Sequence, residues 1–288
     1  MSLFDRLVDD ALAARDDLAV LRPVVEKELL HHDIMRELAE AGLLARLVFI
    51  GGTCLRTCYG SPRLSEDLDF TGGADFRRED LAGLGETLTK HLMARYGHAV
   101  SVGEPVKTGA KVSTWKLRIE TRPERPDLPA QRIHIDVCAI PSHDPRPMML
   151  RNLYGIEMGT SGLILRAQSR EEIFADKLVA LAFRENRVKN RDLWDIAWLR
   201  QQGVEPRLEL LPKKLDDHHR EAAEFIELLR DRVALLLRGG SAREDFIAEM
   251  RRFLPVATVR TTIENPDFWT YLTRLVAEES EQAIAAVK

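Results

Sequence analysis

The 288-residue sequence predicts an α+β protein, with a small mixed sheet in an N-terminal domain, residues 1–167, and a helical C-terminal domain, residues 168–288. Segments with apolar residues at every second position, the pattern of half-buried strands, all lie before residue 140. From residue 169 onward apolar residues recur at helical spacing, and Ser169 with Glu172 provides the serine and glutamate of a helix-capping box. A domain boundary is therefore expected just before Ser169.

The composition is that of a soluble globular protein. Hydrophobic residues make up 45% of the chain and charged residues 31%, and no stretch of about eighteen apolar residues could span a membrane. Because the acidic N-terminus lacks the basic and apolar regions of a signal peptide, we expect a cytoplasmic protein without membrane contact. The net charge of −4 means that any nucleic-acid contact must be local. Three cysteines are too few for a disulfide framework and are expected in the core: Cys54, Cys58 and Cys138.

A strand, a glycine turn and a helix follow one another from residue 47. The apolar run 47–50 predicts a short buried strand, Gly51-Gly52-Thr53 a turn, and residues from Cys54 a helix. Two glycines allow a ligand to approach the backbone closely, and the amides of a first helical turn attract anions such as a triphosphate. The hydroxyl of Thr53 could bind the same phosphates.

An acidic pair follows fourteen residues after this turn. In the segment Asp67-Leu68-Asp69-Phe70, an extended backbone places both carboxylates on one face and the two apolar side chains on the other. Two carboxylates together with phosphate oxygens form the ligand set that Mg²⁺ prefers. The sequence therefore predicts a metal and nucleotide site.

The remaining elements of the N-terminal half complete a sheet with helices. Residues 17–45 and 78–96 predict helices, and residues 100–102, 114–119 and 132–137 predict strands. His31 and His32 are neighbours on the first of these helices, so we expect surface positions for them, not one binding site. In the last strand Asp136 lies on the face opposite to its apolar neighbours, where it could join Asp67 and Asp69; Glu120 is the alternative third acid.

The C-terminal half carries a lysine in an apolar helix and a basic segment. Lys177 lies within residues 173–181, where the ordinary interpretation is a side chain that reaches the surface along its apolar neighbours. Four of the eight residues 184–191 are basic. Asp192 and Asp195 follow at a spacing that nearly shares one helical face, and the sequence leaves open which of them belongs to a site.

Taken together, these motifs resemble the AbiEii/AbiGii toxin family of the DNA polymerase β-like nucleotidyltransferase superfamily. The family pattern reads GGT-x-L, then S-x-D-L-D-[FL], a later lysine helix and an R-D-x-x-D helix, and the likeness runs from Gly51 to Ile196. The resemblance implies a nucleotidyltransferase fold and the transfer of a nucleoside monophosphate from a nucleoside triphosphate (NTP) to RNA. Transfer RNA is the expected acceptor, growth arrest the consequence, and a cognate antitoxin a possible partner.

The resemblance also implies roles for individual residues. The expected catalytic residues are Asp67, Asp69, Asp136, Lys177, Asp192 and Asp195. The nucleotide is expected to contact Gly51, Gly52, Thr53, Ser65, Lys177 and Arg191. The metal ligands, for two Mg²⁺ ions, are expected to be Asp67, Asp69 and Asp136. The RNA is expected to contact Arg184, Arg187 and Lys189.

Two other functions are compatible with the motifs. A nucleotidyltransferase acting on a small molecule such as an antibiotic would require an enclosed, acidic acceptor pocket. A non-catalytic nucleotide- or RNA-binding protein of the same fold would be expected to have lost one of the paired acids, and Asp67 and Asp69 are both present.

Overall fold

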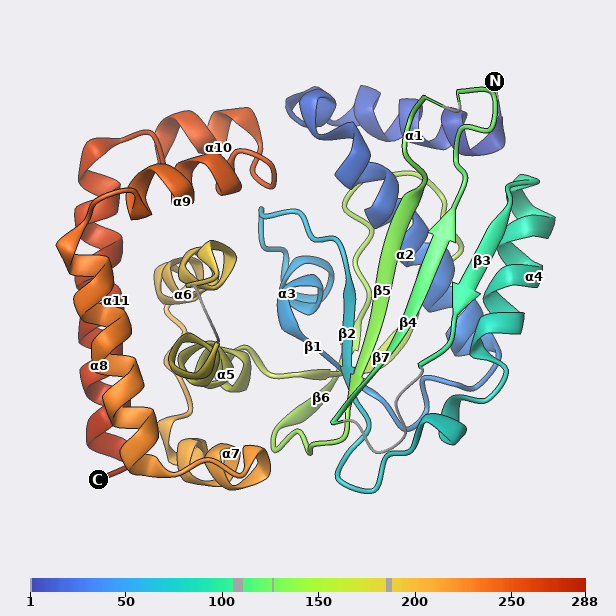
Figure 1. Cartoon of the computed structure of the whole chain (residues 1–288). Helices are drawn as coiled ribbons and strands as arrows, with labels where there is room; N and C mark the ends of the chain where they lie inside the picture. Colours follow the sequence, from blue (N-terminus) through green and yellow to red (C-terminus); the bar gives the residue numbers. More distant parts are fainter. Residues whose placement is uncertain (1, 106–110, 126, 185–187) are drawn as a thin grey trace. The chain divides into compact units, whose positions relative to one another are not determined.

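The computed structural model describes residues 2–105, 111–125, 127–184 and 188–288 (Figure 1). The chain folds into two compact units, of which the first ends at Gln168 and the second begins at Ser169. Over the described residues, no helix is both long and apolar enough to cross a membrane.

The first unit is built on a mixed sheet, as predicted. Its described residues form seven strands in the order β3-β4-β5-β2-β1-β7-β6, with β2 parallel to β5, β1 parallel to β7, and the other neighbours antiparallel. The strands are β1 (Val48–Ile50), β2 (Leu68–Thr71), β3 (Val100–Gly103), β4 (Val112–Ile119), β5 (Gln131–Cys138), β6 (Pro145–Met149) and β7 (Ile164–Gln168). The sequence pattern indicated the first five but neither β6 nor β7.

Helices pack on the sheet face that carries the alternating apolar residues. They are α1 (Leu3–Ala14), α2 (Arg22–Glu40), α3 (Gly51–Tyr59) and α4 (Leu84–Tyr96), with the short 3₁₀ turns η1 (Asp16–Leu21) and η2 (Arg78–Leu81). Ser2 caps α1 in a reciprocal capping box with Asp5. In β4 and β5, Trp115, Ile133 and Ile135 point into the core, so the residues between them lie on the opposite face.

One expectation for this half was wrong, and one predicted helix is shorter than expected. The helix predicted for residues 17–45 is confirmed as α2, which begins at Arg22 and ends at Glu40, while Asp16–Leu21 form a 3₁₀ turn before it. His31 and His32 are buried, at 1% and 2% exposure, because α2 is covered by several elements and has no broad solvent-facing side. Neighbouring residues of a helix that is enclosed in this way can both be internal.

The second unit is helical, as predicted. Ser169 caps its first helix by accepting a hydrogen bond from the Glu172 amide at 3.1 Å. An aromatic cluster of Trp194, Phe246, Phe268 and Trp269 lies between its later helices. The elements are α5 (Arg170–Phe183), α6 (Asn190–Gln201), η3 (Leu208–Leu210), α7 (Leu211–His218), α8 (Ala222–Arg238), α9 (Ala242–Met250), α10 (Val256–Thr261) and α11 (Pro266–Ala286).

Candidate active site

Two acidic residues lie side by side on neighbouring parallel strands. Asp69 of β2 is in register with Asp136 of β5, and both side chains lie on the face opposite to the core residues Leu68 and Ile135. The hydroxyl of Thr114, which is opposite Asp136 on β4, donates to Asp136 Oδ1 at 2.5 Å. The sheet therefore pairs the two carboxylates through its register, although 66 residues separate them in the sequence.

Asp67 lies two residues before Asp69, on the same face of the sheet. Its Oδ1 accepts a hydrogen bond from the backbone amide of His134 at 3.0 Å, which joins the start of β2 to β5. The His134 ring lies beside it, with Nδ1 3.8 Å from the same oxygen. One oxygen of Asp67 thus helps to join β2 to β5, while the carboxylate remains partly exposed.

The start of α3 lies against the acidic residues. The helix begins at Gly51, so Gly51 and Gly52 belong to its first turn, and their amides are among those without a partner inside the helix. Gly51 has φ +76°, and a Cβ at this position would lie 2.7 Å from Oδ2 of Asp69. Glycine is needed here because of both the left-handed backbone and the close carboxylate.

A guanidinium group occupies the space beside the second glycine. A Cβ on Gly52 would lie 2.3 Å from Nη2 of Arg63, which is only 3% exposed and donates to the Leu64 carbonyl at 3.0 Å. The first turn of α3 therefore has a fixed positive charge next to its amides. Arg63 is not among the predicted site residues, and the signal that could have indicated it is its position four residues before Asp67.

The two predicted hydroxyl ligands face into the protein. Thr53 is fully buried; its hydroxyl bonds to the Asp67 carbonyl oxygen and lies 2.7 Å from the Ser65 hydroxyl. These contacts hold the segment before β2 against α3. In this structure they support the acidic residues, whereas the prediction for both hydroxyls was a contact with phosphate.

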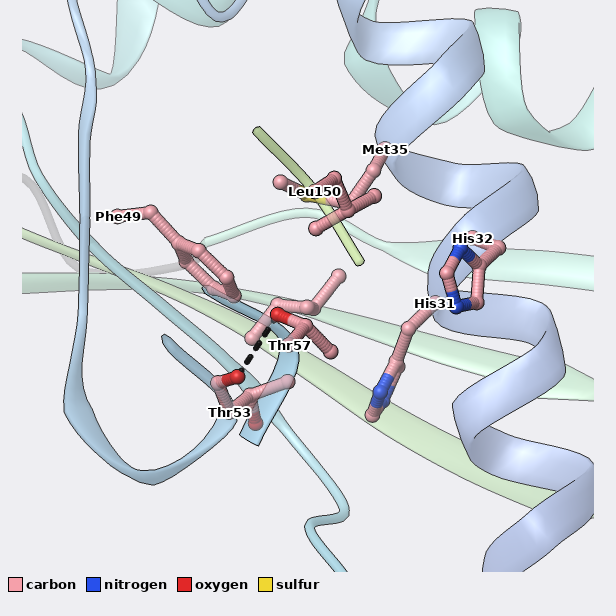
Figure 2. A pocket seen from close by; sticks show the side chains of 8 residues that line it. His31, His32, Met35, Phe49, Thr53, Thr57 and Leu150 are labelled. Atoms are coloured by element: carbon pink, nitrogen blue, oxygen red, sulfur yellow. Dashed lines mark hydrogen bonds between the residues drawn. The ribbon is translucent and has the colours of Figure 1, made fainter. Parts of the chain in front are cut away.

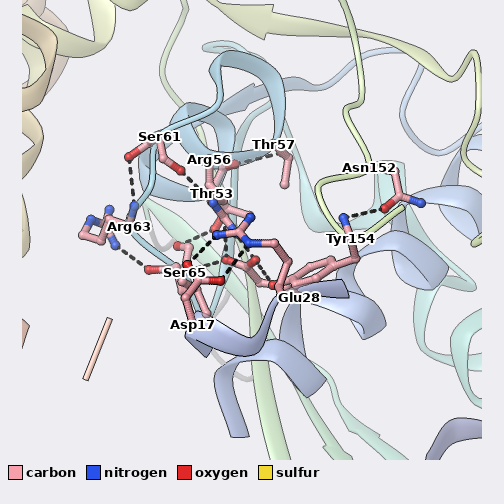
Figure 3. A network of polar contacts seen from close by, with 12 residues as sticks. Asp17, Glu28, Thr53, Arg56, Thr57, Ser61, Arg63, Ser65, Asn152 and Tyr154 are labelled. Atoms are coloured by element: carbon pink, nitrogen blue, oxygen red, sulfur yellow. Dashed lines mark hydrogen bonds and ion pairs between the residues drawn. The ribbon is translucent and has the colours of Figure 1, made fainter. Parts of the chain in front are cut away.

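A buried polar network holds the same segment from the other side (Figure 3). Glu28 of α2 accepts hydrogen bonds from the Ser65 amide at 2.9 Å, from Arg56 Nε at 3.1 Å and from the Tyr154 hydroxyl. Arg56 also donates to the Ser61 carbonyl at 2.9 Å. Because Ser65 is two residues before Asp67, a carboxylate far away in the sequence fixes the approach to the acidic pair.

Behind the turn, a narrow apolar pocket has no room for a water molecule (Figure 2). It is lined by residues of α2, α3, β1 and β2, among them His31, His32 and Thr57. His31 Nε2 bonds to the Glu66 carbonyl and must carry the proton, while its buried Nδ1 has no hydrogen-bond partner among the described residues. Burial lowers the pKa of both histidines, that of His32 to about 4. The neutral rings therefore support the site from within the core and offer no ligand to it.

The second unit contains its own charged cluster. The ammonium of Lys177 lies 2.6 Å from Asp192 Oδ1 and 2.8 Å from Asp195 Oδ2, so both aspartates contact it. It is thus buried between two carboxylates, in contrast to the interpretation of a lysine that reaches the surface. Burial raises the pKa of Asp192, but the charges of Lys177, Lys189 and Arg184 outweigh burial and hold that pKa at about 2.

The predicted basic residues have different environments. Arg184 pairs with Asp192 at 3.1 Å, and burial lowers the pKa of Lys189 to about 8. Arg191 pairs with Glu249 at 3.4 Å, with its guanidinium over the Phe253 ring. Arg187 lies outside the described residues.

Comparison with known proteins assigns the family. The model of the nucleotidyl transferase AbiEii toxin of type IV toxin–antitoxin systems matches residues 33–274, which is most of the chain. The chain belongs to the AbiEii family. Its membership confirms the resemblance seen in the motifs, and it makes the chain a member of a nucleotidyltransferase toxin family.

One solved structure agrees with this AbiEii assignment at the level of the fold. MenT4, a nucleotidyltransferase toxin from Mycobacterium tuberculosis, aligns over 97% of this chain and 99% of its own, with a TM-score of 0.53 and 19% identity. JHP933 from Helicobacter pylori aligns over 90% of this chain and 93% of its own, with a TM-score of 0.48 and 17% identity. A comparison with curated proteins gives no match.

Proposed function

We propose that this AbiEii chain transfers a nucleoside monophosphate from an NTP to a hydroxyl of RNA, with transfer RNA as the acceptor, and thereby arrests growth. The observation that carries the proposal is the pairing of Asp69 with Asp136 directly beside the glycine start of α3. Helix amides suit the phosphates, and paired carboxylates suit a reaction at the α-phosphorus. The chain would act as the toxin of a toxin–antitoxin pair in the cytoplasm.

Magnesium fits the donor set of the first unit. Over the described residues, no group of three or more His, Cys, Asp or Glu side chains is already arranged around a metal position. Mg²⁺ does not require such a cage, because it takes one or two carboxylates and completes its shell with water and phosphate oxygens. Asp67, Asp69 and Asp136 would hold the two ions. When bound, Mg²⁺ would stabilise negative charge on the attacking and leaving oxygens.

The chain's own groups would bind and orient the reactants. The amides of Gly51 and Gly52, with Arg63 beside them, would bind phosphate oxygens. Asp136 would take the proton of the acceptor hydroxyl, since its carboxylate lies on the same face as Asp69. The acceptor oxygen then bonds to the α-phosphorus, the bond from that phosphorus to the bridging oxygen breaks, and pyrophosphate leaves.

For the second unit we propose the anion-binding roles that the family resemblance implies. Lys177 and Arg191 would bind nucleotide phosphates, and Arg184, Arg187 and Lys189 would bind RNA. Among the described residues of this cluster, the charges of Lys177, Arg184 and Lys189 all act on buried Asp192. Arg191 lies close enough to act on Lys189, while its own guanidinium pairs with Glu249. This local positive charge supports the proposal in a chain whose net charge is −4.

Labelled NTPs, offered one at a time with total RNA and Mg²⁺, test the proposal directly. Wild-type protein should label RNA, and Asp69→Asn should abolish labelling while leaving the melting temperature unchanged, since an amide is a poorer metal ligand. The exposed Asp75→Asn provides a control in which the same charge is lost outside the site. Undiminished transfer by Asp69→Asn would refute the assignment of the acids, and label in small molecules alone would favour the antibiotic-type alternative.

A further inference from the structure

One face of the sheet carries an ordered array of polar side chains that begins at the acidic pair. The first row consists of Asp69, Asp136 and Thr114, which are in register across β2, β5 and β4. In the next row, His134 is opposite Lys116.

The last row of this array pairs Arg132 with Arg118. Same-face residues along a strand are roughly 6.6 Å apart. The array therefore runs from the carboxylates to two arginines over a distance of about 13 Å.

In the part of the first unit that the structure describes, the helices that pack on these strands lie on the opposite side. Trp115, Leu117 and Ile133, which alternate with the array, are at most 1% exposed. Helix α4 packs on that buried side, since a Cβ on Gly85 of α4 would lie 3.4 Å from Val102 Cβ. Lys116, Arg118 and Arg132 are all exposed. We call the surface formed by Lys116, Arg118, Arg132 and His134 the open sheet face.

The cations of the open sheet face are poorly neutralised by the protein. Among the residues that the structure describes, Lys116 and Arg132 have no hydrogen-bond or ion-pair partner. Arg118 pairs with Glu120 at 2.6 Å, but this pair is exposed and contributes little. Two arginines directly opposite each other on a sheet repel and reduce stability. An arrangement that is unfavourable for the fold, next to the proposed reaction centre, indicates a ligand with negative charge.

We propose that the open sheet face binds the sugar–phosphate backbone of the acceptor RNA and leads its reactive hydroxyl to Asp136. This inference rests on the proposed function, because it assumes an RNA acceptor. The array favours a polyanion over a small acceptor, since its cations extend along two strands away from the acids. In a chain of net charge −4, these side chains concentrate positive charge where the acceptor has to arrive.

The chemistry of the face favours contact with phosphates over contact with bases. Phe and Tyr are absent from β3, β4 and β5, all of which are described, and the ring of their one tryptophan, Trp115, is buried on the other side. The imidazole of His134 is the one ring on the open sheet face, and it lies beside Asp67. Base stacking on a sheet needs exposed aromatic rings. Lysine and arginine bind phosphates irrespective of sequence, so this surface would position the RNA while other contacts choose it.

The double variant Lys116→Gln/Arg132→Gln tests this surface. RNA binding is measured by fluorescence anisotropy without NTP over a series of salt concentrations, and transfer is measured with labelled NTP. Loss of two phosphate contacts should reduce the slope of log K against log salt by about 1.4 for single-stranded RNA, at 0.7 per contact. The KM for RNA should rise several-fold, and the KM for NTP should stay unchanged.

Two controls separate charge from position and from damage to the fold. Arg46→Gln/Lys90→Gln removes the same charge from the turn before β1 and from α4, and it should leave the salt slope at the wild-type value. Lys116→Arg/Arg132→Lys keeps the charge on the open sheet face and should keep RNA binding. An unchanged salt slope and RNA affinity in the glutamine variant, with wild-type transfer intact, would overturn this inference alone. Absence of transfer to RNA by wild-type protein would instead refute the proposed function.

Discussion

Gly51 leaves open the space in which Oδ2 of Asp69 lies, because a Cβ on Gly51 would come within 2.7 Å of that oxygen. Gly51→Ala should therefore displace the carboxylate as well as strain the backbone at φ +76°. We expect a stability loss of about 1–2 kcal/mol from the left-handed conformation. Transfer should fall about 100-fold, because a misplacement of about 1 Å in a reacting group can have that effect.

Gly97 provides a matched control for this prediction. Its φ is +68°, yet a Cβ there would have no neighbour within 4 Å. Gly97→Ala should lose a similar amount of stability, measured by chemical denaturation, and retain wild-type transfer at temperatures where it is folded. If both variants kept full activity, the contact between Gly51 and Asp69 would have no part in the reaction.

Lys177 is predicted to serve both stability and phosphate binding. Lys177→Ala leaves Asp192 and Asp195 buried without their cation, and breaking such a buried pair typically costs about 3–5 kcal/mol. If Lys177 also binds phosphate, its loss should weaken NTP binding, which isothermal titration calorimetry measures on the folded variant.

A second buried lysine of the same unit separates the two effects. Lys214 lies 2.8 Å from Glu172 and 2.6 Å from Asp176, so it is buried against two carboxylates, as Lys177 is. Lys214→Ala should lose comparable stability and keep the wild-type affinity for NTP. Equal affinities in the two variants would reduce Lys177 to a structural role.

The sequence predicted the parts of the fold that repeat regularly. The alternation of apolar and polar residues in β4 and β5 predicted which face of each strand is buried. The alternation of acidic and apolar residues in β2 correctly predicted that Asp69 and Leu68 lie on opposite faces of the sheet. Strand β6 was not predicted, because Pro145 and Pro147 interrupt the residue pattern of a strand. Prolines are tolerated here because β6 is an edge strand.

The acidic residues of the candidate site could be selected from the sequence, but the residues that support them in the structure could not. Glu28 is 37 residues from Ser65, and Tyr154 is a further 89 residues on, so only the tertiary structure brings them together. Thr53 and Ser65 have the composition of phosphate ligands, and nothing in a local pattern tells whether a hydroxyl turns inward. The pairing of Asp69 with Asp136 depended on strand order, which spacing alone does not determine.

Glu28 is predicted to be a positioning residue for the acidic pair. Glu28→Gln removes the charge that balances buried Arg56 and weakens the bond to the Ser65 amide. We expect a loss of about 3–5 kcal/mol, as for other broken buried pairs. The kcat should decrease, while the KM for NTP should change less, because the variant loosens the segment that leads to Asp67.

Tyr154→Phe is the milder comparison within the same network. It removes one hydrogen bond to Glu28, worth about 1.5–3 kcal/mol for a charged acceptor, and leaves the Ser65 contact in place. Its kcat should remain close to that of the wild type. A kcat that fell equally in both variants would mean that general loosening, and not the Ser65 contact, governs activity.

The buried histidines predict that the protein loses stability in mildly acidic solution. Burial lowers the pKa of His32 to about 4, whereas an unfolded histidine has its ordinary value of 6.5. Between these values the unfolded chain binds the proton and the folded chain does not, so acid favours unfolding. The contribution is complete above pH 6.5 and is lost as the pH falls toward 4. The difference of 2.5 pKa units corresponds to about 3 kcal/mol.

His32→Asn removes this titration while keeping a polar atom for the Thr160 hydroxyl, which lies 2.8 Å from His32 Nδ1. The variant should be less stable than the wild type at neutral pH, because it loses packing in the pocket of Figure 2. Between about pH 7.5 and about pH 5, however, its free energy of unfolding should fall less steeply, since one proton fewer is taken up on unfolding. Urea denaturation followed by circular dichroism at both pH values measures the two slopes. Part of the dependence should remain in the variant, because burial lowers the pKa of His31 as well. Identical slopes for wild type and variant would show that His32 does not titrate on unfolding in this range.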